Sequence, residues 1–167
     1  MKYLLPIWEK FNRTNSDNWE LVMLGEQGNE RDFVDDFIAG KKLKNIRIDK
    51  PTDKISQYYE ESAILMMTSV FEGFPLVLAE AMSRGCVPIA FESFSSIHDI
   101  IEPEQNGILV TPFNIEEFVC KLNALVTDDE KRQMLSYNAI KVANRFDLDT
   151  IGSQWVDMFC NLSQQIQ

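Results

Sequence analysis

Residues 64–91 read ILMMTSVFEGFPLVLAEAMSRGCVPIAF and contain the signals of a strand, a loop, a helix and a second strand, in that order. The apolar runs 64–67 and 87–91 each predict a short buried strand. Between them, Pro75 marks the first turn of a helix and Gly85 lies just past its end, where these residues are favoured. Apolar strands separated by a helix are typical of a parallel sheet that is covered on both faces.

The same alternation of short strands and helices continues on both sides of this stretch. Gly40 lies where one of these helices is predicted to end, in the position of a C-cap. Alternation of this kind predicts an α/β fold, a Rossmann-like doubly wound parallel sheet with helices on both faces. The further strands are predicted at 21–24, 46–48 and 108–110, and further helices at 6–11, 31–39 and 55–59.

Helices follow one another after the last predicted strand. Asn114 and Glu117 have the spacing of a capping box at the start of the first helix, and Thr127 and Glu130 repeat that spacing for the second. Each of these helices carries one apolar face, which indicates packing on a core.

A third helix begins after Asp149 and forms a C-terminal segment. Because its apolar side chains recur at helical spacing, we expect this face to pack on the rest of the protein. We therefore divide the chain into a Rossmann-like domain, residues 1–145, and a C-terminal helix, residues 146–167, that packs on it. The apolar positions of that helix are Ile151, Trp155, Met158, Phe159 and Leu162.

Charge and hydropathy exclude several classes of protein. The 167 residues are 45% apolar, which suffices for a folded core, and 16 Lys and Arg against 26 Asp and Glu give a net charge of −10. This charge disfavours nucleic acid, whose phosphates are bound by clustered cations. No window approaches the ~20 apolar residues of a membrane span. The apolar stretch at the N-terminus is too short for a signal peptide.

Three cysteines, Cys86, Cys120 and Cys160, lie far apart in apolar stretches and form no CxxC motif. With His98 as the one histidine they do not make a zinc site, so no metal ligands are predicted. Buried, reduced thiols are the expected state, and they indicate a cytoplasmic protein that is at most peripheral to a membrane.

Two loops are candidate ligand sites, because ligands of doubly wound sheets bind beyond the carboxyl ends of the strands. Residues 25–28, Gly-Glu-Gln-Gly, lack the dinucleotide-binding glycine pattern, so a tight connection is the favoured interpretation. Residues 69–80 combine a strand end, Gly73 and the start of a helix. Free N–H groups of Leu76 and Val77 in the first helical turn, together with the helix dipole, predict a site for a phosphate or diphosphate.

Two glutamates flank this helix terminus, Glu72 in the loop and Glu80 inside the helix. Carboxylates accept hydrogen bonds from vicinal hydroxyls, so the pair could hold two sugars, one on each side of a diphosphate. Structural alternatives are equally open. Glu72 would then complement the helix dipole, and Glu80 would form an i, i+4 ion pair with Arg84.

The stretch 72–90 resembles the signature of an enzyme family. Glu72 and Glu80, separated by seven residues with Gly-Phe-Pro between them, and the continuation EAMSRGCVP resemble the E-x7-E motif of the retaining GT-B glycosyltransferases, group 1 (GT4-like). The resemblance covers the chain up to its final helices, since similar flanking segments lie at 19–25, 54–59 and 93–110.

The resemblance implies a role for each residue of the motif. Glu72 would be the catalytic-site carboxylate and would bind hydroxyls of the donor hexose. The sugar is transferred with retention at its anomeric carbon, and no metal or other cofactor is needed. The donor-binding residues would be Gly73 and Phe74 for the sugar, Leu76 and Val77 for the diphosphate, and Glu80 for the ribose of a nucleotide diphosphosugar.

The chain also departs from the family pattern. GT-B enzymes have two Rossmann-like domains with the acceptor domain first, whereas this chain resembles only the second domain and lacks its opening strand. That strand is central in a 3-2-1-4-5-6 sheet, so we expect a gap or a rearranged pairing there. His98, in the loop after 87–91, is expected to be structural rather than a ligand.

These features together predict the donor-binding portion of a hexosyltransferase that acts on a glycan or lipid-linked acceptor, with a truncated N-terminus. Its partners would be a nucleotide sugar and the missing acceptor domain, and the chain alone would transfer no sugar. The alternative is a non-catalytic nucleotide-binding or interaction module of the same fold.

Overall fold

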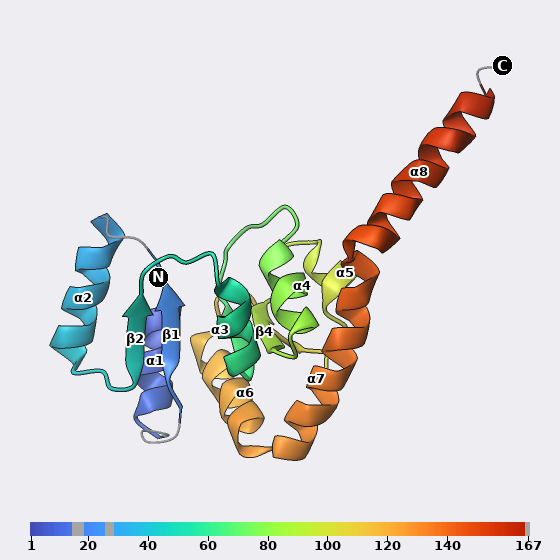
Figure 1. Cartoon of the computed structure of the whole chain (residues 1–167). Helices are drawn as coiled ribbons and strands as arrows, with labels where there is room; N and C mark the ends of the chain where they lie inside the picture. Colours follow the sequence, from blue (N-terminus) through green and yellow to red (C-terminus); the bar gives the residue numbers. More distant parts are fainter. Residues whose placement is uncertain (15–18, 26–28, 166–167) are drawn as a thin grey trace.

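A computed structural model of the chain describes residues 1–14, 19–25 and 29–165 (Figure 1). Short strands alternate with helices as far as β5, and helices alone follow. The elements are α1 (Leu4–Asn12), β1 (Leu21–Leu24), α2 (Asn29–Lys41), β2 (Ile46–Asp49), α3 (Ile55–Glu61), β3 (Ile64–Met67), α4 (Leu76–Ser83), β4 (Val87–Phe91), α5 (Ile97–Ile100), β5 (Ile108–Val110), α6 (Ile115–Thr127), α7 (Asp129–Ala143), the 3₁₀ turn η1 (Asn144–Phe146) and α8 (Leu148–Gln165).

The strands form two separate parallel sheets, β1-β2 and β3-β4-β5. The predicted α/β fold with parallel strands is therefore confirmed. The expected interruption of the sheet is also present, because β1 and β3 are not hydrogen-bonded to each other. The interruption falls between β1 and β3, the position at which the family resemblance predicted it.

The central strand β4 is buried on both sides, and this places helices on both faces of the sheet. Val87, Ile89 and Phe91 belong to a core that also contains α1 and α6. Ala90 points to the opposite core, which contains side chains of α4, α5 and α7. Because successive strand residues face opposite ways, a five-residue apolar strand with a helix layer on either side is the expected result.

The ends of α6 and α7 test the predicted caps. Asn114 caps α6 as predicted, since its Oδ1 accepts the Glu117 N–H at 3.1 Å. The predicted start of the next helix at Thr127 is wrong. Thr127 is the last residue of α6, and the carboxylate of Asp128 caps α7 by accepting the Lys131 N–H at 2.9 Å. Thr127 and Asp128 are adjacent and can both cap a helix, and the charged residue, Asp128, is the one that caps α7.

The end of α2 also differs from the prediction. The helix continues through Gly40 to Lys41, and the residue with left-handed backbone is Lys42, with φ of 53°. The Leu43 N–H donates to the Ile38 carbonyl at 3.1 Å, which closes a Schellman motif around Lys42. Gly85 does occupy such a position after α4, with φ of +89°.

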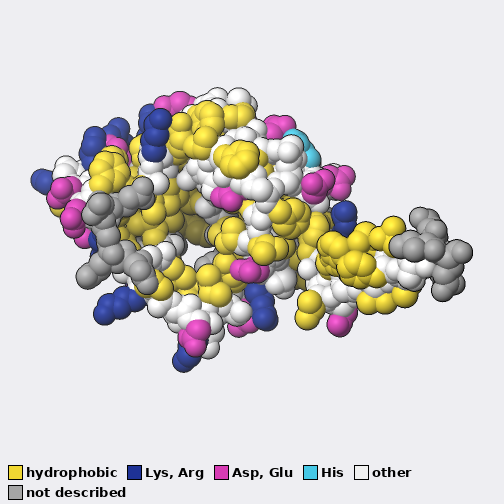
Figure 2. All heavy atoms as spheres, turned by 90° about the horizontal axis from the view of Figure 1, so that it is seen from above, with side chains coloured by type: hydrophobic (Ala, Val, Ile, Leu, Met, Phe, Trp, Pro, Cys, Tyr) yellow, Lys and Arg dark blue, Asp and Glu magenta, His cyan; other side chains and the backbone are white. Residues whose placement is uncertain are grey.

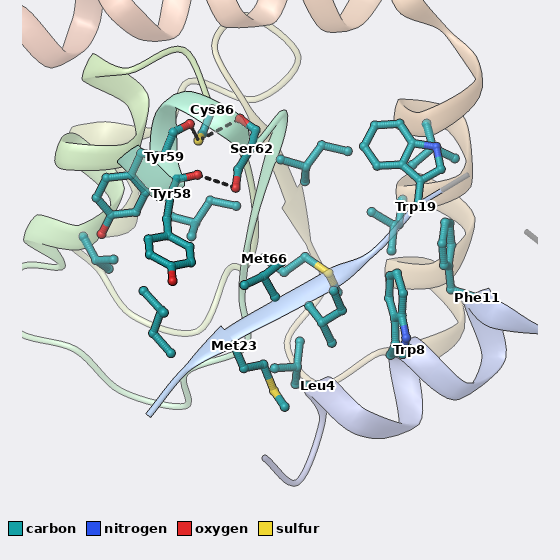
Figure 3. Close-up of a pocket in the computed structure, with 18 of the residues that line it drawn as sticks. Leu4, Trp8, Phe11, Trp19, Met23, Tyr58, Tyr59, Ser62, Met66 and Cys86 are labelled. Carbon is teal, nitrogen blue, oxygen red and sulfur yellow. Dashed lines mark hydrogen bonds between the residues drawn. The ribbon is translucent and has the colours of Figure 1, made fainter. Parts of the chain in front are cut away.

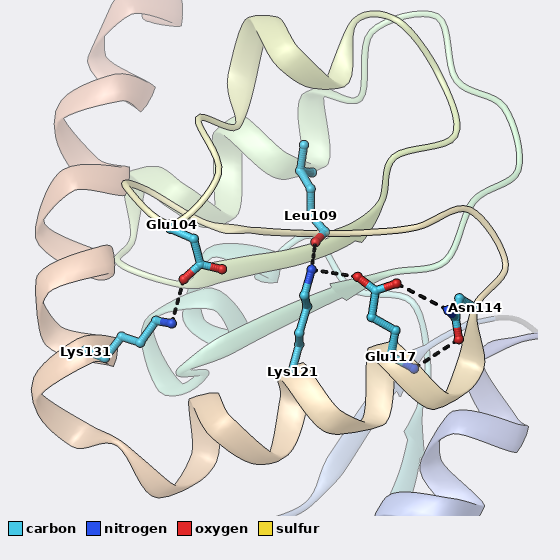
Figure 4. A network of polar contacts seen from close by, with 6 residues as sticks. All are labelled: Glu104, Leu109, Asn114, Glu117, Lys121 and Lys131. Carbon is cyan, nitrogen blue, oxygen red and sulfur yellow. Dashed lines mark hydrogen bonds and ion pairs between the residues drawn. The ribbon is translucent and has the colours of Figure 1, made fainter.

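A polar network fastens α6 to the sheet (Figure 4). The Lys121 ammonium donates to the Leu109 carbonyl at 2.7 Å and pairs with the Glu117 carboxylate at 2.7 Å. These contacts lower the pKa of Glu117, with the hydrogen bond from Lys121 as the largest cause. Nearby, Lys131 of α7 pairs with Glu104 at 2.6 Å.

The turn between α5 and β5 depends on the buried side chain of Asn106. Its Oδ1 accepts the Glu102 N–H at 2.8 Å, and its Nδ2 donates to the Ile100 carbonyl at 2.9 Å. One amide therefore satisfies two backbone groups, of which the Ile100 carbonyl would otherwise be buried without a partner.

The C-terminal helix α8 projects away from the body of the protein, and apolar side chains cover much of its surface (Figures 1 and 2). Phe146 packs against the core and Ile151 is partly buried, but the apolar positions from Trp155 onward are exposed, so the packing expected for residues 146–167 is met only at the start of this segment. None of the described helices is long and apolar enough to cross a membrane. The exposed side chains include Leu148 (87%), Trp155, Met158, Phe159 and Leu162.

The three cysteines differ in their surroundings. Cys86 is buried, and burial raises the pKa of its thiol to about 11. Cys120 and Cys160 are exposed, so the prediction that all three thiols are buried is wrong for these two. All three are free thiols.

Candidate functional site

The predicted site lies in the loop between β3 and α4, beyond the carboxyl end of β3. Two hydroxyls from the loop after β4 hold it in place. The Ser93 hydroxyl donates to the Ser69 carbonyl at 2.8 Å, and the Ser96 hydroxyl donates to the Gly73 carbonyl at 2.6 Å. The loops that follow two neighbouring parallel strands are thereby joined into one surface at the carboxyl edge of the sheet.

A ring contact supports the same loop from the other side. The Phe74 ring lies edge-on to Phe146 of η1, with ring centroids 5.4 Å apart. Gly73 does not adopt a positive φ, and a Cβ built on it would meet no atom within 4 Å. The space beside Gly73 is therefore open, and a ligand could approach its backbone closely.

The first turn of α4 offers fewer donors than the sequence predicted. The Leu76 N–H is not free, because it donates to the Phe74 carbonyl at 3.0 Å. The Leu78 N–H donates to the carbonyl of Pro75, the N-cap residue, also at 3.0 Å. Among the described residues Val77 N–H has no acceptor, so it is the amide available to an anion at this helix terminus.

Glu80 is exposed on α4, and its side-chain partner is a tyrosine. The Tyr59 hydroxyl of α3 donates to Glu80 Oε2 at 3.4 Å. Arg84 pairs instead with Glu60 at 3.0 Å, so the predicted ion pair between Glu80 and Arg84 is wrong. Burial, and then the neighbouring Glu80 carboxylate, raise the pKa of Tyr59 to about 12, so the phenol remains a donor at neutral pH.

Glu72 is half-buried in the loop. Within the described part of the chain its carboxylate takes part in no hydrogen bond or ion pair, so both of its oxygens are available to a ligand. Exposed apolar side chains surround it, namely Val70, Phe71 (81% exposed) and Leu76. The surface around the two glutamates therefore combines acceptor oxygens with apolar contact area.

The remaining candidates contribute less to this surface. His98 Nε2 lies 3.0 Å from Glu92 Oε1, and both side chains are about half exposed. In the first candidate loop, residues 26–28 lie outside the described residues. Where the structure describes the chain, no group of three or more His, Cys, Asp or Glu side chains could hold a metal ion.

Sequence reasoning missed the residues that hold the site together. Tyr59 orients one of the two glutamates, and Ser93 and Ser96 fix the loop that carries the other. Their sequence signals are weak, because serine and tyrosine occur in many loops and helices. Only the pairing of β3 with β4 and the packing of α3 beside α4 bring them to the glutamates.

Comparison with known proteins decides the family. The family of glycosyl transferases group 1 matches this chain over residues 1–142. The chain belongs to this family. The match includes both glutamates and every strand of the two sheets.

Curated relatives include several bacterial glycosyltransferases of greater length. An uncharacterized glycosyltransferase of Haemophilus influenzae is 29% identical over 154 residues, covering 92% of this chain and 43% of that protein. The amylovoran biosynthesis glycosyltransferase AmsD of Erwinia amylovora is 27% identical, covering 93% of this chain and 43% of that protein. The lipopolysaccharide 1,6-galactosyltransferase of Escherichia coli is 35% identical over 119 residues, covering 67% of this chain and 32% of that protein. The chain thus spans less than half the length of these relatives.

Several solved structures share this fold. TarM superposes with a TM-score of 0.84 at 23% identity, covering 95% of this chain and 32% of its own. HepE of Anabaena, in complex with UDP, superposes with a TM-score of 0.82 at 23% identity, covering 93% of this chain and 44% of the HepE chain. The C-terminal domain of LpcC, a glycosyl transferase group 1 family protein of Francisella tularensis, gives a TM-score of 0.77 at 24% identity, covering 88% of this chain and 79% of the LpcC domain.

Proposed function

We propose that this chain is the donor-binding portion of a retaining, GT4-like hexosyltransferase that uses a nucleotide diphosphosugar. The observation that carries the proposal is the pair of glutamates on either side of the α4 N-terminus, with Glu80 oriented by Tyr59. Family membership supports it, as does the presence of UDP in the HepE structure, which shares this fold.

The chemistry of each group fits this role. The Glu72 carboxylate would accept hydrogen bonds from hydroxyls of the hexose, next to the open backbone of Gly73 and Phe74. The N-terminus of α4 would bind the diphosphate, chiefly through the free Val77 N–H, with Leu76 contributing after its turn opens. As the bond between the anomeric carbon and the diphosphate breaks, this terminus would stabilise the charge of the leaving group.

Glu80 would bind the ribose. Its carboxylate has four lone-pair positions, and Tyr59 uses one of them, which leaves acceptors for both vicinal hydroxyls. The phenol of Tyr59 is buried and cannot follow Glu80 if that side chain turns away. It therefore favours one orientation of the carboxylate before the nucleotide arrives, and this lowers the entropic cost of binding.

The role of the parent protein is inferred from the longer glycosyltransferases to which this chain is similar. A longer parent would contribute an acceptor domain ahead of this chain, and transfer to a glycan or lipid-linked acceptor would take place between the two domains. The parent would act in the cytoplasm, at most at the membrane surface, without a metal. This chain alone would bind donor nucleotide without transferring sugar, since the acceptor would have no site.

Calorimetric titration of the chain with UDP, GDP and ADP tests the proposal. We expect one nucleotide to bind and Glu80→Gln to weaken it about tenfold, the effect of losing ~1.5 kcal/mol of hydrogen bonds to a charged acceptor. Glu60→Gln is the matched control, because it removes the same charge from an exposed glutamate that pairs with Arg84. Absence of binding to all three nucleotides by the folded chain would overturn the proposal.

A non-catalytic module of the same fold is the second candidate. The exposed apolar side chains around Glu72, Phe71 above all, favour it, because apolar surface of this kind is suited to a protein partner. The two candidates differ in the effect of Glu72→Gln. A donor site predicts that this variant discriminates poorly between UDP and a UDP-hexose, whereas an interaction module predicts no difference from the parent chain.

A further inference from the structure

A pocket of about 250 Å³ lies between the ends of α1 and α2, beside the start of β2. Four of its lining residues are lysine or arginine and one is glutamate, so the side chains carry a net charge of +3 in a protein whose net charge is −10. We call this pocket the basic pocket. Its polar lining residues are Glu9, Asn12, Arg13, Lys41, Lys42 and Lys44.

Helix α1 has two faces of different character, and the basic pocket adjoins only one of them. Trp8 and Phe11 project from α1 into a cavity of about 340 Å³ between the two sheets, whose described lining includes no charged residue (Figure 3). Glu9, Asn12 and Arg13 follow one another at helical spacing on another face and line the basic pocket. One face of α1 is therefore apolar, and the other contributes charge and hydrogen-bonding groups.

The basic pocket lies at the end of the strands opposite to the proposed donor site. In Figure 1, α2 descends to the lower end of β2, whereas the loop between β3 and α4 lies at the top of the molecule. Neither Glu72 nor Glu80 lines the pocket. A ligand bound there would leave the donor site free, so an inference about this pocket goes beyond the proposed function and does not depend on it.

Glu9 holds two of the cations beside the pocket. Its side chain is only 14% exposed, and its Oε1 pairs with Arg13 Nη2 at 2.6 Å and with Lys41 Nζ at 3.4 Å. A cation from the end of each helix is therefore fixed by a single carboxylate oxygen. Because this carboxylate is shared between two cations, it repels an incoming anion less than an unpaired carboxylate would.

Backbone contacts fix the segment that carries Lys42 and Lys44. Lys42, with φ of 53°, forms the turn that ends α2. The Lys44 N–H donates to Asn12 Oδ1 at 3.2 Å, and the Lys44 carbonyl accepts a hydrogen bond from Trp8 Nε1 at 3.3 Å. Side chains of α1 thus fasten this segment, and the pocket is formed without a ligand.

The ammonium groups of Lys42 and Lys44 have no partner among the described residues. Both side chains are exposed, and where the structure describes the chain neither forms an ion pair or a ring contact. Of the lysines and arginines, only Lys50 and Lys54, in the loop after β2, share this property within the described ranges. Since the chain has 26 Asp and Glu for 16 Lys and Arg, two adjacent cations without a carboxylate are a local surplus of positive charge.

Asn12 adds a neutral donor to the lining. Its Oδ1 accepts the Lys44 N–H, and this contact fixes the orientation of the amide. Its Nδ2 is buried, and no described group accepts a hydrogen bond from it. Buried donors are nearly always paired in folded proteins, so this amide favours a ligand that supplies oxygen acceptors.

The helix ends account for part of the cluster, because cations near a helix C-terminus stabilise the helix. Arg13 and Lys41 lie at the ends of α1 and α2, and each helix end carries a partial charge of about −0.5. With both ends included, the net charge of the pocket falls from +3 to about +2. Lys42 and Lys44 lie beyond α2 and supply this surplus, which matches the charge of about −1.5 to −2 on a phosphate monoester at neutral pH.

We propose that the basic pocket binds a phosphate group, carried by a small soluble phosphate monoester or by the headgroup of a lipid. Lys42 and Lys44 would donate charge-assisted hydrogen bonds to the phosphate oxygens, and the Asn12 amide would supply a neutral donor. A phosphate fits better than a single carboxylate, because it matches the whole surplus charge. It also fits better than nucleic acid, because the acidic remainder of the chain would repel a long polyanion.

Titration with glycerol 3-phosphate at constant ionic strength, followed by NMR, tests the soluble source. We expect saturable shifts of the backbone amides of Lys42 and Lys44 and of the side-chain amide of Asn12. The double variant Lys42→Gln/Lys44→Gln should bind about tenfold more weakly, because it loses two solvent-screened cationic contacts. The matched control is Lys50→Gln/Lys54→Gln, which removes the same charge at the other end of β2 and should leave the affinity unchanged.

Cosedimentation with vesicles tests the lipid source. Phosphatidic acid in phosphatidylcholine vesicles presents the same phosphate monoester as glycerol 3-phosphate, and vesicles of phosphatidylcholine alone are the neutral control. If the occupant is a headgroup, the chain sediments with phosphatidic acid, and Lys42→Gln/Lys44→Gln abolishes this whereas Lys50→Gln/Lys54→Gln does not. If the occupant is a soluble ester, glycerol 3-phosphate binds and the chain remains in the supernatant.

Three results would overturn the inference. If neither glycerol 3-phosphate nor phosphatidic acid binds the folded chain, the cations of the pocket serve only the helix ends. If the two double variants weaken binding equally, the attraction depends on net charge rather than on this pocket. If Lys42→Gln/Lys44→Gln binds as tightly as the parent chain, the phosphate is held elsewhere.

Discussion

The contact between Tyr59 and Glu80 leads to the sharpest prediction. The substitution Tyr59→Phe removes the phenolic hydroxyl and keeps the ring, which is buried against Ala81, Cys86 and Leu65. If the hydroxyl positions Glu80 for a ribose, the variant should bind UDP more weakly, although Tyr59 itself would not touch the nucleotide.

The size of the effect follows from the geometry. A full-strength hydrogen bond to a charged acceptor contributes about 1.5–3 kcal/mol. This one spans 3.4 Å, longer than the usual range for O–H···O bonds, and Glu80 is exposed to solvent, so we expect about 0.5–1 kcal/mol. Since 1.4 kcal/mol corresponds to a factor of ten, the Kd for UDP should rise about two- to fivefold.

A double-mutant cycle separates positioning from a general loss of structure. Tyr59→Phe, Glu80→Gln and the double variant are titrated with UDP by calorimetry, with Tyr137→Phe on α7 as the control tyrosine. If Tyr59 acts through Glu80, adding Tyr59→Phe to Glu80→Gln changes nothing further. The effect should be constant from pH 7 to pH 9, because the raised pKa of Tyr59, about 12, keeps the phenol protonated.

Two outcomes refute this reasoning. If the two substitutions weaken UDP binding additively, Tyr59 contributes by a route that does not involve Glu80. If Tyr59→Phe lowers the Tm and leaves the Kd unchanged, the hydroxyl serves stability alone.

Three further predictions concern the fold and the thiols. Asn106→Leu should lower the free energy of unfolding by about 1–3 kcal/mol in chemical denaturation, because it leaves the buried Ile100 carbonyl unpaired and also removes the acceptor of the Glu102 N–H. Glu117→Gln should lower it by about 0.5–1 kcal/mol at pH 7. Because the folded-state pKa of Glu117 is lowered, the carboxylate stabilises the fold fully above its ordinary pKa of 4.5, and the difference between parent and variant should shrink below that pH and disappear once the pH has fallen through the lowered folded-state pKa. A thiol reagent at pH 8 should label Cys120 and Cys160 in the folded chain and Cys86 only after unfolding.

Local chemistry made several elements predictable. Apolar runs of three to five residues identified four of the described strands, since a strand buried on both faces must be apolar throughout. The fifth, β2, was predicted although Arg47 interrupts its apolar residues, and it is only partly buried. The cap at Asn114 and the left-handed Gly85 were predictable for the same reason, because each depends on groups within a few residues. Where two signals competed, as at Thr127 and Asp128, sequence reasoning chose the wrong one.

Partners of side chains were much harder to predict. The spacing of Glu80 and Arg84 favoured an ion pair along α4, yet both residues turn to α3, where Tyr59 and Glu60 lie. An i, i+4 pair on an exposed helix is worth only ~0.2–0.5 kcal/mol, so any nearby alternative from another element can replace it. The distances between helices decide which partner a charged side chain takes, and the spacing of residues along one helix does not reveal those distances.

The apolar face of α8 shows the same limit at a larger scale. Periodicity established that a stripe of the helix is apolar, but it did not identify what covers the stripe. In this chain the rings of Trp155 and Phe159 contact each other in a tilted arrangement, with centroids 5.6 Å apart, and both remain exposed. An apolar stripe indicates that burial would be favourable, and only the surrounding structure decides whether burial occurs.

The sequence by itself determined the alternation of strands and helices, the position of the two glutamates at the start of α4 and, through their signature, the family. The resemblance to that family also predicted that the sheet would have a gap or a rearranged pairing at the place of its opening strand. Only the tertiary structure decided that the sheet has a gap rather than a rearranged pairing, that Glu80 is bonded by Tyr59 rather than paired with Arg84, and that Leu76 uses its own N–H within the turn. The reason is physical: periodicity and caps act over a few residues, whereas these contacts depend on how segments distant in the chain pack against one another.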